Sequence, residues 1–284
     1  MTDPSSSASD MFSVIIAAHN EEGYITTCLE ALRIQDDTAG PLEVIVAANG
    51  CTDRTVVLVE NQIAAFAHAG HCLICLDLAR PSKVGALNAG EMAATGTARA
   101  YLDADVLCDP ALMGQLRRAL ATDAPRYATG TLKVVPARSW ITRQYARFWQ
   151  RLPFVQEGAV GAGLFAVNAT GRARWAAFPD IISDDTFVRL QFAPAERIEV
   201  PARYHWPMIE GWSDLVRVRR RQDRGVAQIN EIYPHLQINA AHAVTGLTGL
   251  LRLLLQDPVG FTVYLSVHLA VRLRRADNSW TRGR

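Results

Sequence analysis

The sequence predicts an α/β fold in which a mostly parallel, Rossmann-like sheet is flanked by helices, with further helices at the C-terminal end. Two observations lead to this prediction. Continuously apolar segments alternate with segments whose apolar residues have helical spacing, as a sheet covered by helices on both faces requires. A polar loop follows each of the main apolar segments, and ligands bind at the carboxyl ends of strands in such sheets.

The first half of the chain shows this alternation most clearly. Buried strands are expected at Phe12–Ala18, Leu42–Ala47, Cys72–Leu78 and Ala100–Val106. Three helices are expected between them, marked by Ile25, Cys28, Leu29 and Leu32, by Val56, Val59, Ile63 and Phe66, and by Lys83–Ala94. Asn20 is a candidate N-cap for the first helix, and Thr52 or Asp53 for the second.

The second half does not continue this regular alternation of strands and helices. Helices are expected at Leu112–Leu120, Trp140–Leu152 and Thr186–Phe192, and strands at Tyr127–Val135, Leu164–Asn168 and Ile198–Val200. The glycine run Gly158–Gly163 either lets backbone approach a ligand closely or forms a flexible turn. Ser183 or Asp184 could simply cap the helix at Thr186, which competes with a functional interpretation of the acidic pair Asp184-Asp185.

Composition limits the function classes. The chain has 284 residues and a net charge of +1, which gives no sign of a nucleic-acid-binding protein. Its five cysteines, an odd number, favour reduced thiols in a cytoplasmic setting. Cys72 and Cys75 have the spacing of a zinc or redox pair but lie in an apolar segment, so a buried strand is favoured.

The chain is expected to have three parts. Residues 1–10 are predicted to be a disordered lead-in, because they lack the basic start and apolar centre of a signal peptide. Residues 11–235 are predicted to form the catalytic domain, with halves at 11–106 and 107–235. Residues 236–284 are predicted to be a helical C-terminal segment.

Asp103 and Asp105 end the fourth predicted strand. On an extended chain two residues at i and i+2 point to the same face, and two carboxylates there suit Mg²⁺ or Mn²⁺ carrying a phosphorylated ligand. The alternative is a strand end followed by an Asp-rich turn, since Asp109 follows soon after. The first strand–helix turn lacks the Gly-x-Gly-x-x-Gly fingerprint, which argues against a nicotinamide or flavin dehydrogenase.

Six segments in this order resemble family 2 glycosyltransferases, which have the GT-A nucleotide-diphospho-sugar transferase fold. They are Val14–Glu22, Asn49–Thr55, Lys83 with Ala86–Gly90, Leu102–Asp105, Gly161–Gly163 with Phe165, and Ser183–Thr186. The resemblance runs from about Phe12 to Gly225. It implies an inverting transfer of one sugar from a nucleoside-diphosphate sugar, with a UDP-sugar as the expected donor, to a saccharide or lipid-linked acceptor.

The resemblance also implies roles for the donor-side residues. Ala18, Asn20 and Glu21 correspond to the segment that holds the nucleoside. Asn49 stands where the family often has an acidic base-contacting residue, and Lys83 stands near the diphosphate. Asp103, Ala104 and Asp105 match the DxD pattern, in which the last Asp usually ligates the metal, here Mn²⁺ or Mg²⁺. Gly163 belongs to the matching glycine segment and is expected to bind the nucleotide-sugar.

The remaining matches concern the acceptor side. Asp184-Asp185 resembles the family's acidic pair, whose second member is the general base. A dense arginine run, Arg217–Arg224, is either a solvated helix face or a diphosphate-binding group. Processive relatives carry Gln-x-x-Arg-Trp there, and only Arg221 matches, which argues for single addition. His205 could contact diphosphate or metal, but a structural role is favoured.

Two other functions remain open on these residues. One is a sugar nucleotidyltransferase, and the other is a sugar-nucleotide-binding scaffold without catalysis. The first class would want a Gly-rich, basic first loop, which His19–Glu22 is not. Intact acidic pairs at both positions argue against the scaffold.

The C-terminal segment has two apolar stretches, Ala243–Leu255 and Val259–Val271, with a polar break between them. Neither reaches the roughly 18–20 uncharged residues of a spanning helix. One interpretation is a helical hairpin that packs on the domain or on a second subunit. The other is an interfacial membrane attachment with arginines at the headgroups, which would place the protein at the inner face of the cell membrane. Analogy with relatives that use lipid-linked acceptors favours the second.

Overall fold

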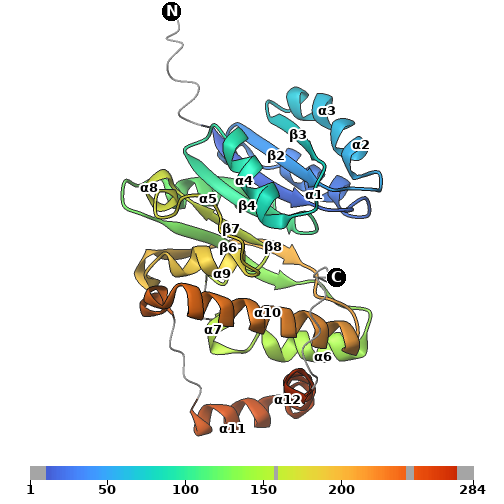
Figure 1. Cartoon of the computed structure of the whole chain (residues 1–284), viewed down its shortest axis with the longest axis vertical. Helices are drawn as coiled ribbons and strands as arrows, with labels where there is room; N and C mark the ends of the chain where they lie inside the picture. The colour runs from blue at the N-terminus through green and yellow to red at the C-terminus, as the bar shows by residue number, and fades with distance from the viewer. Residues whose placement is uncertain (1–10, 157–158, 241–245, 274–284) are drawn as a thin grey trace, which may run out of the picture.

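The computed structural model describes residues 11–156, 159–240 and 246–273 (Figure 1). The predicted lead-in at residues 1–10 lies outside this part. One sheet of eight strands, in the order β3-β2-β1-β4-β7-β6-β8-β5, organises the described chain. Its strands are β1 (Phe12–Ala18), β2 (Leu42–Asn49), β3 (Cys72–Leu78), β4 (Ala98–Asp103), β5 (Leu107–Cys108), β6 (Tyr127–Val134), β7 (Leu164–Val167) and β8 (Arg197–Trp206).

Helices connect these strands in the predicted order. Those of the first half are α1 (Ile25–Arg33), α2 (Thr55–Glu60), α3 (Ile63–His68) and α4 (Lys83–Ala93). Those that follow are α5 (Leu112–Leu120), α6 (Trp140–Trp149), α7 (Pro153–Gln156), α8 (Ala169–Arg172), α9 (Asp184–Leu190), α10 (Trp212–Ile232), α11 (Leu247–Gln256) and α12 (Pro258–Leu273). Short 3₁₀ helices lie at η1 (Asp37–Ala39), η2 (Pro194–Glu196) and η3 (Pro234–Asn239).

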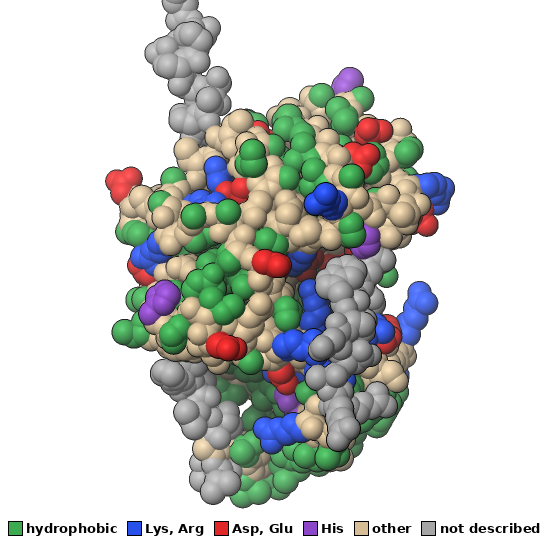
Figure 2. All heavy atoms as spheres, in the orientation of Figure 1, with side chains coloured by type: hydrophobic (Ala, Val, Ile, Leu, Met, Phe, Trp, Pro, Cys, Tyr) green, Lys and Arg blue, Asp and Glu red, His purple; other side chains and the backbone are tan. Residues whose placement is uncertain are grey.

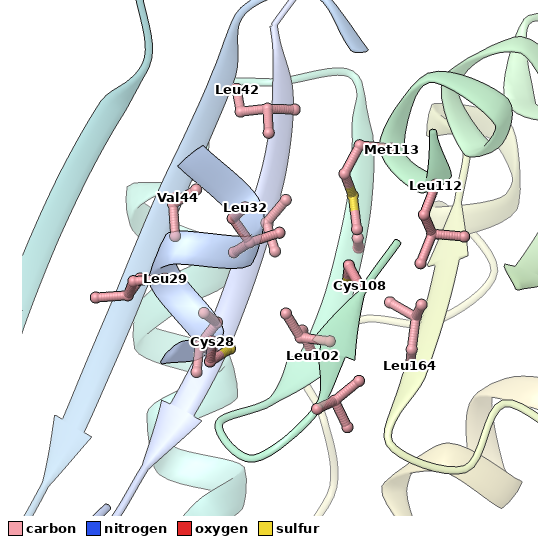
Figure 3. Packing of buried hydrophobic residues seen from close by; sticks show 14 of the residues in the cluster. Cys28, Leu29, Leu32, Leu42, Val44, Leu102, Cys108, Leu112, Met113 and Leu164 are labelled. Atoms are coloured by element: carbon pink, nitrogen blue, oxygen red, sulfur yellow. The ribbon is translucent and has the colours of Figure 1, made fainter. Parts of the chain in front are cut away.

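The first half is the parallel, doubly covered sheet that the apolar runs predict. β1 pairs in parallel with β2 and β4, and β2 pairs in parallel with β3. Every residue of β2 is buried. Figure 3 shows Cys28, Leu29 and Leu32 of α1 lying over the strands that carry Val44 and Leu102. Full burial of each such aliphatic side chain contributes about 1.5–3 kcal/mol, so this layer fixes where the strand ends lie.

Two predictions in this half are wrong in detail. The single helix expected from Val56 to Phe66 is two helices, α2 and α3, because the chain tightens at Gln62, whose N–H bonds to the Val59 carbonyl at 2.9 Å. β3 is the edge strand of the sheet rather than a strand buried on both sides, and the Cys72 side chain is exposed. Cys72 and Cys75 are free thiols.

The second half extends the sheet with mixed pairing. β7 is antiparallel to both β4 and β6, and β6 runs parallel to β8 with a register shift at Gly130/Thr131. β8 is much longer than the predicted Ile198–Val200, because it also pairs with β5 at its end. The antiparallel β4–β7 pair brings the start of β7 against the end of β4, which is where the cleft described below opens.

The C-terminal helices pack on their own domain. α12 lies against α6 and α10, with Val267 fully buried, at the end of the molecule opposite α2 and α3 (Figure 1). Asp257, at the break between α11 and α12, accepts hydrogen bonds from the Arg147 guanidinium at 2.9 and 2.5 Å and from the Gly260 N–H at 3.0 Å. α12 therefore contacts the domain, and the choice between the hairpin and the membrane attachment stays a prediction.

The C-terminal helices are short compared with a membrane-spanning helix. Within the described ranges, no individual helix is both long and apolar enough to cross a bilayer. The helix pair Gly249–Gln256 and Pro258–Leu273 meets the length and composition criteria only when taken together, with a bend of 118° between its members.

Candidate functional site

A cleft of about 880 Å³ opens at the carboxyl ends of β1, β2 and β4 and continues toward α9 and α10. It brings together eleven of the twelve predicted site residues. The lining residues that the sequence singled out are Asn20, Glu21, Asn49, Lys83, Asp103, Ala104, Asp105, Gly163, Asp184, Asp185 and Arg221. Ala18 is fully buried behind the cleft wall and contributes its backbone carbonyl to the bonding described next.

Asn20 ties the first two loops together. Its backbone has a φ of 53°, in the left-handed region that Asn tolerates. Its side-chain oxygen accepts hydrogen bonds from the N–H groups of Thr52 at 2.6 Å and Asp53 at 3.3 Å. Tyr24 rather than Asn20 occupies the N-cap position of α1, so the predicted capping role of Asn20 is wrong. The loop-to-loop bonds explain instead why an Asn stands here.

Asn49 is buried, and its amide bonds to backbone on both sides. Its Nδ2 donates to the Ala18 carbonyl at 2.8 Å, and its Oδ1 accepts from the Ser82 N–H at 3.0 Å. Its own carbonyl lies 2.6 Å from Nδ1 of His19. The side chain therefore fixes the end of β1, the end of β2 and the start of α4 relative to one another, at the floor of the donor side of the cleft.

Of the first acidic pair, Asp103 is the last residue of a strand and Asp105 lies on the turn that follows. β4 ends at Asp103, and the chain turns so that the Val106 N–H bonds to the Asp103 carbonyl at 3.1 Å. The predicted strand from Ala100 to Val106 is therefore too long, and strand alternation does not determine how the two carboxylates point. The Asp103 N–H donates to the Gly163 carbonyl at 2.9 Å, which holds the turn against the glycine segment.

Lys83 lies between the two acidic pairs. Its Nζ is 3.2 Å from Oδ1 of Asp103 and 3.2 Å from Oδ1 of Asp184, and its side chain is 39% exposed. Burial alone would lower the pKa of Lys83, but the carboxylates of Asp103, Asp184 and Asp185 outweigh that effect and raise it. The ammonium therefore stays charged at the centre of the cleft.

The second acidic pair begins α9, two residues earlier than predicted. Ser183 occupies the N-cap position without a side-chain capping bond, and Asp184 is buried inside the first helical turn. Burial raises the pKa of Asp185, and the neighbouring carboxylate of Asp184 raises it further, while Lys83 and the Thr186 N–H oppose the shift. Asp185 thus keeps its proton to higher pH than an ordinary aspartate.

The glycine segment needs its glycines. Gly161 has a φ of +68° and Gly163 a φ of +77°, a region that side chains rarely adopt. A Cβ on Gly161 would overlap the Tyr127 hydroxyl, and one on Gly163 would lie 2.8 Å from Cδ1 of Trp206. The close approach of backbone that the glycine run suggested is therefore present, against protein side chains as well as the cleft.

The far side of the cleft was largely missed by sequence reasoning. Its wall combines aromatic side chains from α6, α7 and the end of β8 with arginines from α9 and α10: Tyr145, Trp149, Phe154, Trp206, Arg189, Arg219 and Arg221. Arg221 was expected from the arginine run; of the others, only Arg189, four residues after Asp185, had a usable signal, since that spacing places both on one face of a helix. His205 binds Asp109 through Nε2 at 2.8 Å and is not among the lining residues, which supports its structural role.

The residues of the acidic turn fit a divalent metal that arrives with its nucleotide. Asp103 and Asp105 offer hard oxygen ligands at the cleft. Within the described residues, no cluster of three or more His, Cys, Asp or Glu side chains forms a metal site. Mg²⁺ commonly uses one or two carboxylates together with substrate phosphates and water, so a two-carboxylate site matches that habit.

The family model for glycosyl transferase family 2 matches residues 13–174, more than half of the chain. The chain belongs to glycosyltransferase family 2. The matched segment contains Lys83 and the acidic turn, whereas Asp184, Asp185 and Arg221 lie beyond its end. No curated protein sequence matches the chain.

Solved glycosyltransferases share the fold. A mannosyltransferase from Pyrobaculum calidifontis, in complex with GDP-Man and Mn²⁺, is 21% identical with a TM-score of 0.58, covering 93% of this chain and 76% of that one. TarS 1–349 from S. aureus, with UDP, is 13% identical with a TM-score of 0.52, covering 92% and 91%. Glucosyl-3-phosphoglycerate synthase from Mycobacterium tuberculosis, with Mn²⁺, UDP and glucosyl-3-phosphoglycerate, is 18% identical with a TM-score of 0.52, covering 79% and 80%. These likenesses confirm the predicted GT-A fold.

Proposed function

We propose that this glycosyltransferase moves one sugar from a UDP-sugar to a hydroxyl of a saccharide or lipid-linked acceptor, with inversion at the anomeric carbon and with Mn²⁺ or Mg²⁺. The observation that supports this best is the placement of two acidic pairs on one cleft with Lys83 between them. The solved relatives with UDP, GDP-Man and Mn²⁺ support a nucleotide-sugar donor and a divalent metal.

The donor side would bind the nucleotide and its diphosphate. Asn20, Glu21 and Asn49 form the nucleoside end, while Ala104 and Gly163 lie where the sugar would sit. Asp103 and Asp105 would hold the metal, which neutralises charge on the diphosphate leaving group when bound. Lys83 and Arg221 add positive charge to the same cleft, where it would oppose the negative charge that develops on the leaving group.

The acceptor side would supply the base. Asp185 takes the proton of the acceptor hydroxyl as the sugar is transferred, and its raised pKa brings it closer to the pH at which proton transfer is efficient. Asp184 is the wrong carboxylate for this role because Lys83 already pairs with it. A base on one side and a diphosphate on the other is the arrangement that inversion requires.

We further propose that α11 and α12 contact the cytoplasmic surface of a membrane. They expose apolar side chains: Leu250, Leu251, Leu255, Val259, Leu265 and Leu269. Figure 2 shows apolar side chains gathered at this end of the molecule, and Arg252 and Arg272 on the same helices suit anionic headgroups. The free cysteines agree with a reducing compartment.

Vesicle sedimentation tests the membrane contact. Phosphatidylglycerol vesicles should bind the wild type but not the Leu251→Glu/Leu255→Glu variant. A Met92→Glu control, which changes an exposed apolar residue far from these helices, should bind like the wild type. The membrane proposal would be wrong if the wild type does not bind vesicles but sediments as a dimer, and if the same variant is monomeric. The exposed apolar side chains would then contact a second subunit.

Thermal unfolding with nucleotides tests the donor site. Wild type and Asp105→Ala should be melted with UDP and GDP, each with and without Mn²⁺. A ligand that binds only the folded state raises the melting temperature by mass action, by about 2.7 kcal/mol of stability at 100 times Kd. We expect a Mn²⁺-dependent rise with UDP that Asp105→Ala loses. No rise with either nucleotide would overturn the donor assignment.

A further inference from the structure

Arg189 lines the cleft one helical turn beyond the proposed base. Asp185 and Arg189 are four residues apart on α9, so they lie on one face of the helix at an axial separation of about 6 Å. Both line the cleft, and Arg189 is partly buried. Within the described residues no carboxylate lies within 4.0 Å of its guanidinium, whereas Arg172 and Arg174 each have such a partner.

A second guanidinium of the same sign lies near Arg189. Arg197 donates hydrogen bonds to the carbonyls of Phe192 at 2.7 Å and Asn239 at 2.5 Å. Burial and the like charge of Arg189 lower the pKa of Arg197 to about 10. Glu196, the acidic residue beside Arg197, is already held by Arg174 through bonds of 2.5 and 2.7 Å. Among the described residues, neither Arg189 nor Arg197 therefore has a carboxylate within the 4.0 Å of an ion pair.

Hydrogen-bond donors without acceptors lie around this charge. Nε2 of Gln237, on η3, is buried and has no hydrogen-bond partner in the described part of the chain, and Gln237 lines the cleft together with Arg189. The Tyr127 hydroxyl is likewise buried without a partner, but Tyr127 is not among the residues that line the cleft. A buried donor without an acceptor is costly, so its persistence points to a ligand that accepts hydrogen bonds.

We propose that Arg189 and Gln237 form an anion-binding subsite for the acceptor, so that the acceptor hydroxyl belongs to a molecule bearing a phosphate or carboxylate group. This inference rests on the proposed transfer reaction. A guanidinium and amide donors are the groups that recognise such anions. The axial separation from Asp185, about 6 Å, matches a hydroxyl and an anionic group separated by a few bonds, as in a phosphorylated alcohol.

Titration calorimetry with glycerol 3-phosphate and with glycerol tests the subsite, in the presence of saturating UDP and Mn²⁺ so that the diphosphate position is filled. Wild type should bind glycerol 3-phosphate and not glycerol. Arg189→Gln should weaken that binding by about 10-fold or more, as expected for a lost bond to a charged group. Arg118→Gln, an exposed arginine on α5 away from the cleft, should bind like the wild type.

Several outcomes would overturn the subsite. They are no binding of glycerol 3-phosphate by the wild type, equal binding by Arg189→Gln, and competition between glycerol 3-phosphate and UDP. Arg189→Lys, which keeps the charge but not the planar fork, should bind with intermediate affinity and guards against a folding defect in Arg189→Gln. Short-chain phosphatidic acid in a parallel titration separates a lipid source of the phosphate from a soluble one. If UDP itself does not bind, the donor assignment fails, while the same titrations without UDP still report on Arg189.

Discussion

Lys83 of α4 and Asp184 of α9 form an ion pair across the cleft, with Nζ 3.2 Å from Oδ1. Asp184 has a side chain that is only 8% exposed, so without this ammonium it would be a nearly buried charge beside the carboxylate of Asp185. The pair therefore connects the donor half to the acceptor half and also sets the electrostatic environment of the proposed base.

Replacing Lys83 by Met should move the pH dependence of transfer. Lys83 lowers the pKa of Asp185, so its removal raises that pKa. The base must be ionised to act, so the acidic limb of the kcat/KM profile should shift to higher pH. Lys133→Met is a matched control, because Lys133 is an exposed lysine on β6. If kcat/KM falls but the acidic limb of its pH profile does not move, Lys83 contributes to donor binding and does not affect the pKa of the base.

Replacing Asp185 by Asn should separate activity from stability. Transfer should fall by about 10²–10⁴-fold, the usual contribution of a general base, while UDP binding stays unchanged. Because burial and Asp184 raise the pKa of Asp185, its ionisation costs folding free energy at neutral pH. The variant should therefore melt higher at pH 7, by about 2–4 °C for each kcal/mol. The difference should vanish below about pH 4, where the carboxyl is neutral in both states. Retained transfer would assign the base elsewhere.

Replacing Gly161 by Ala should destabilise the glycine segment. The residue has positive φ and its new Cβ would overlap the Tyr127 hydroxyl, so a loss of about 1–3 kcal/mol is expected. Gly23→Ala is the control, since nothing lies within 4 Å of a Cβ there. Denaturant unfolding of both variants measures the difference. Equal stability of the two would show that the segment relaxes freely.

Replacing Arg147 by Ala should loosen α12. It removes two hydrogen bonds from a carboxylate that is 3% exposed, and Arg151, at 3.2 Å, compensates only in part. Arg147 is half exposed, so a loss of about 2 kcal/mol is expected, below the 3–5 of a fully buried pair. Faster hydrogen exchange in residues 247–273, with unchanged exchange in β1, is the measurement.

The same contact predicts an acid response. Burial would raise the pKa of Asp257, but the hydrogen bonds from Arg147 and Gly260 hold it below the ordinary value. The stabilisation is therefore present above about pH 4 and is lost as pH falls through the lowered pKa. Exchange in α12 should rise under acid before exchange in the sheet does. If hydrogen exchange in α12 and in the sheet rises at the same pH, the Arg147–Asp257 contact does not determine the stability of α12.

The spacing of apolar residues predicted the first half of the fold well, because most of its strands are buried on both faces and such strands are continuously apolar. This spacing gave wrong element boundaries where contacts with distant parts of the chain determine the structure. The break at Gln62 splits an otherwise periodic helix, and β3 is apolar although it forms an edge. The end of β4 depends on Gly163, sixty residues later in the chain, which no local pattern near Asp103 records.

The candidate site shows the same division. The motif resemblance singled out eleven residues that line one cleft. It could not show that the Asn49 amide bonds to backbone at Ala18 and Ser82, since that depends on side-chain geometry. Arg189 went unnoticed, because its meaning depends on the absence of a nearby carboxylate in the described structure and on Gln237, from a distant 3₁₀ helix.

The strand order also has a consequence for how the chain folds during synthesis. β1 to β4 pair with one another within the first 103 residues, so all four strands of the first half are available before the second half is synthesised. The free edge of β4 is covered only when β7 emerges, and β5 finds β8 only across roughly a hundred residues. Until then the β4 edge is open to pairing with other nascent chains, so premature termination between β4 and β7 should yield aggregation-prone fragments.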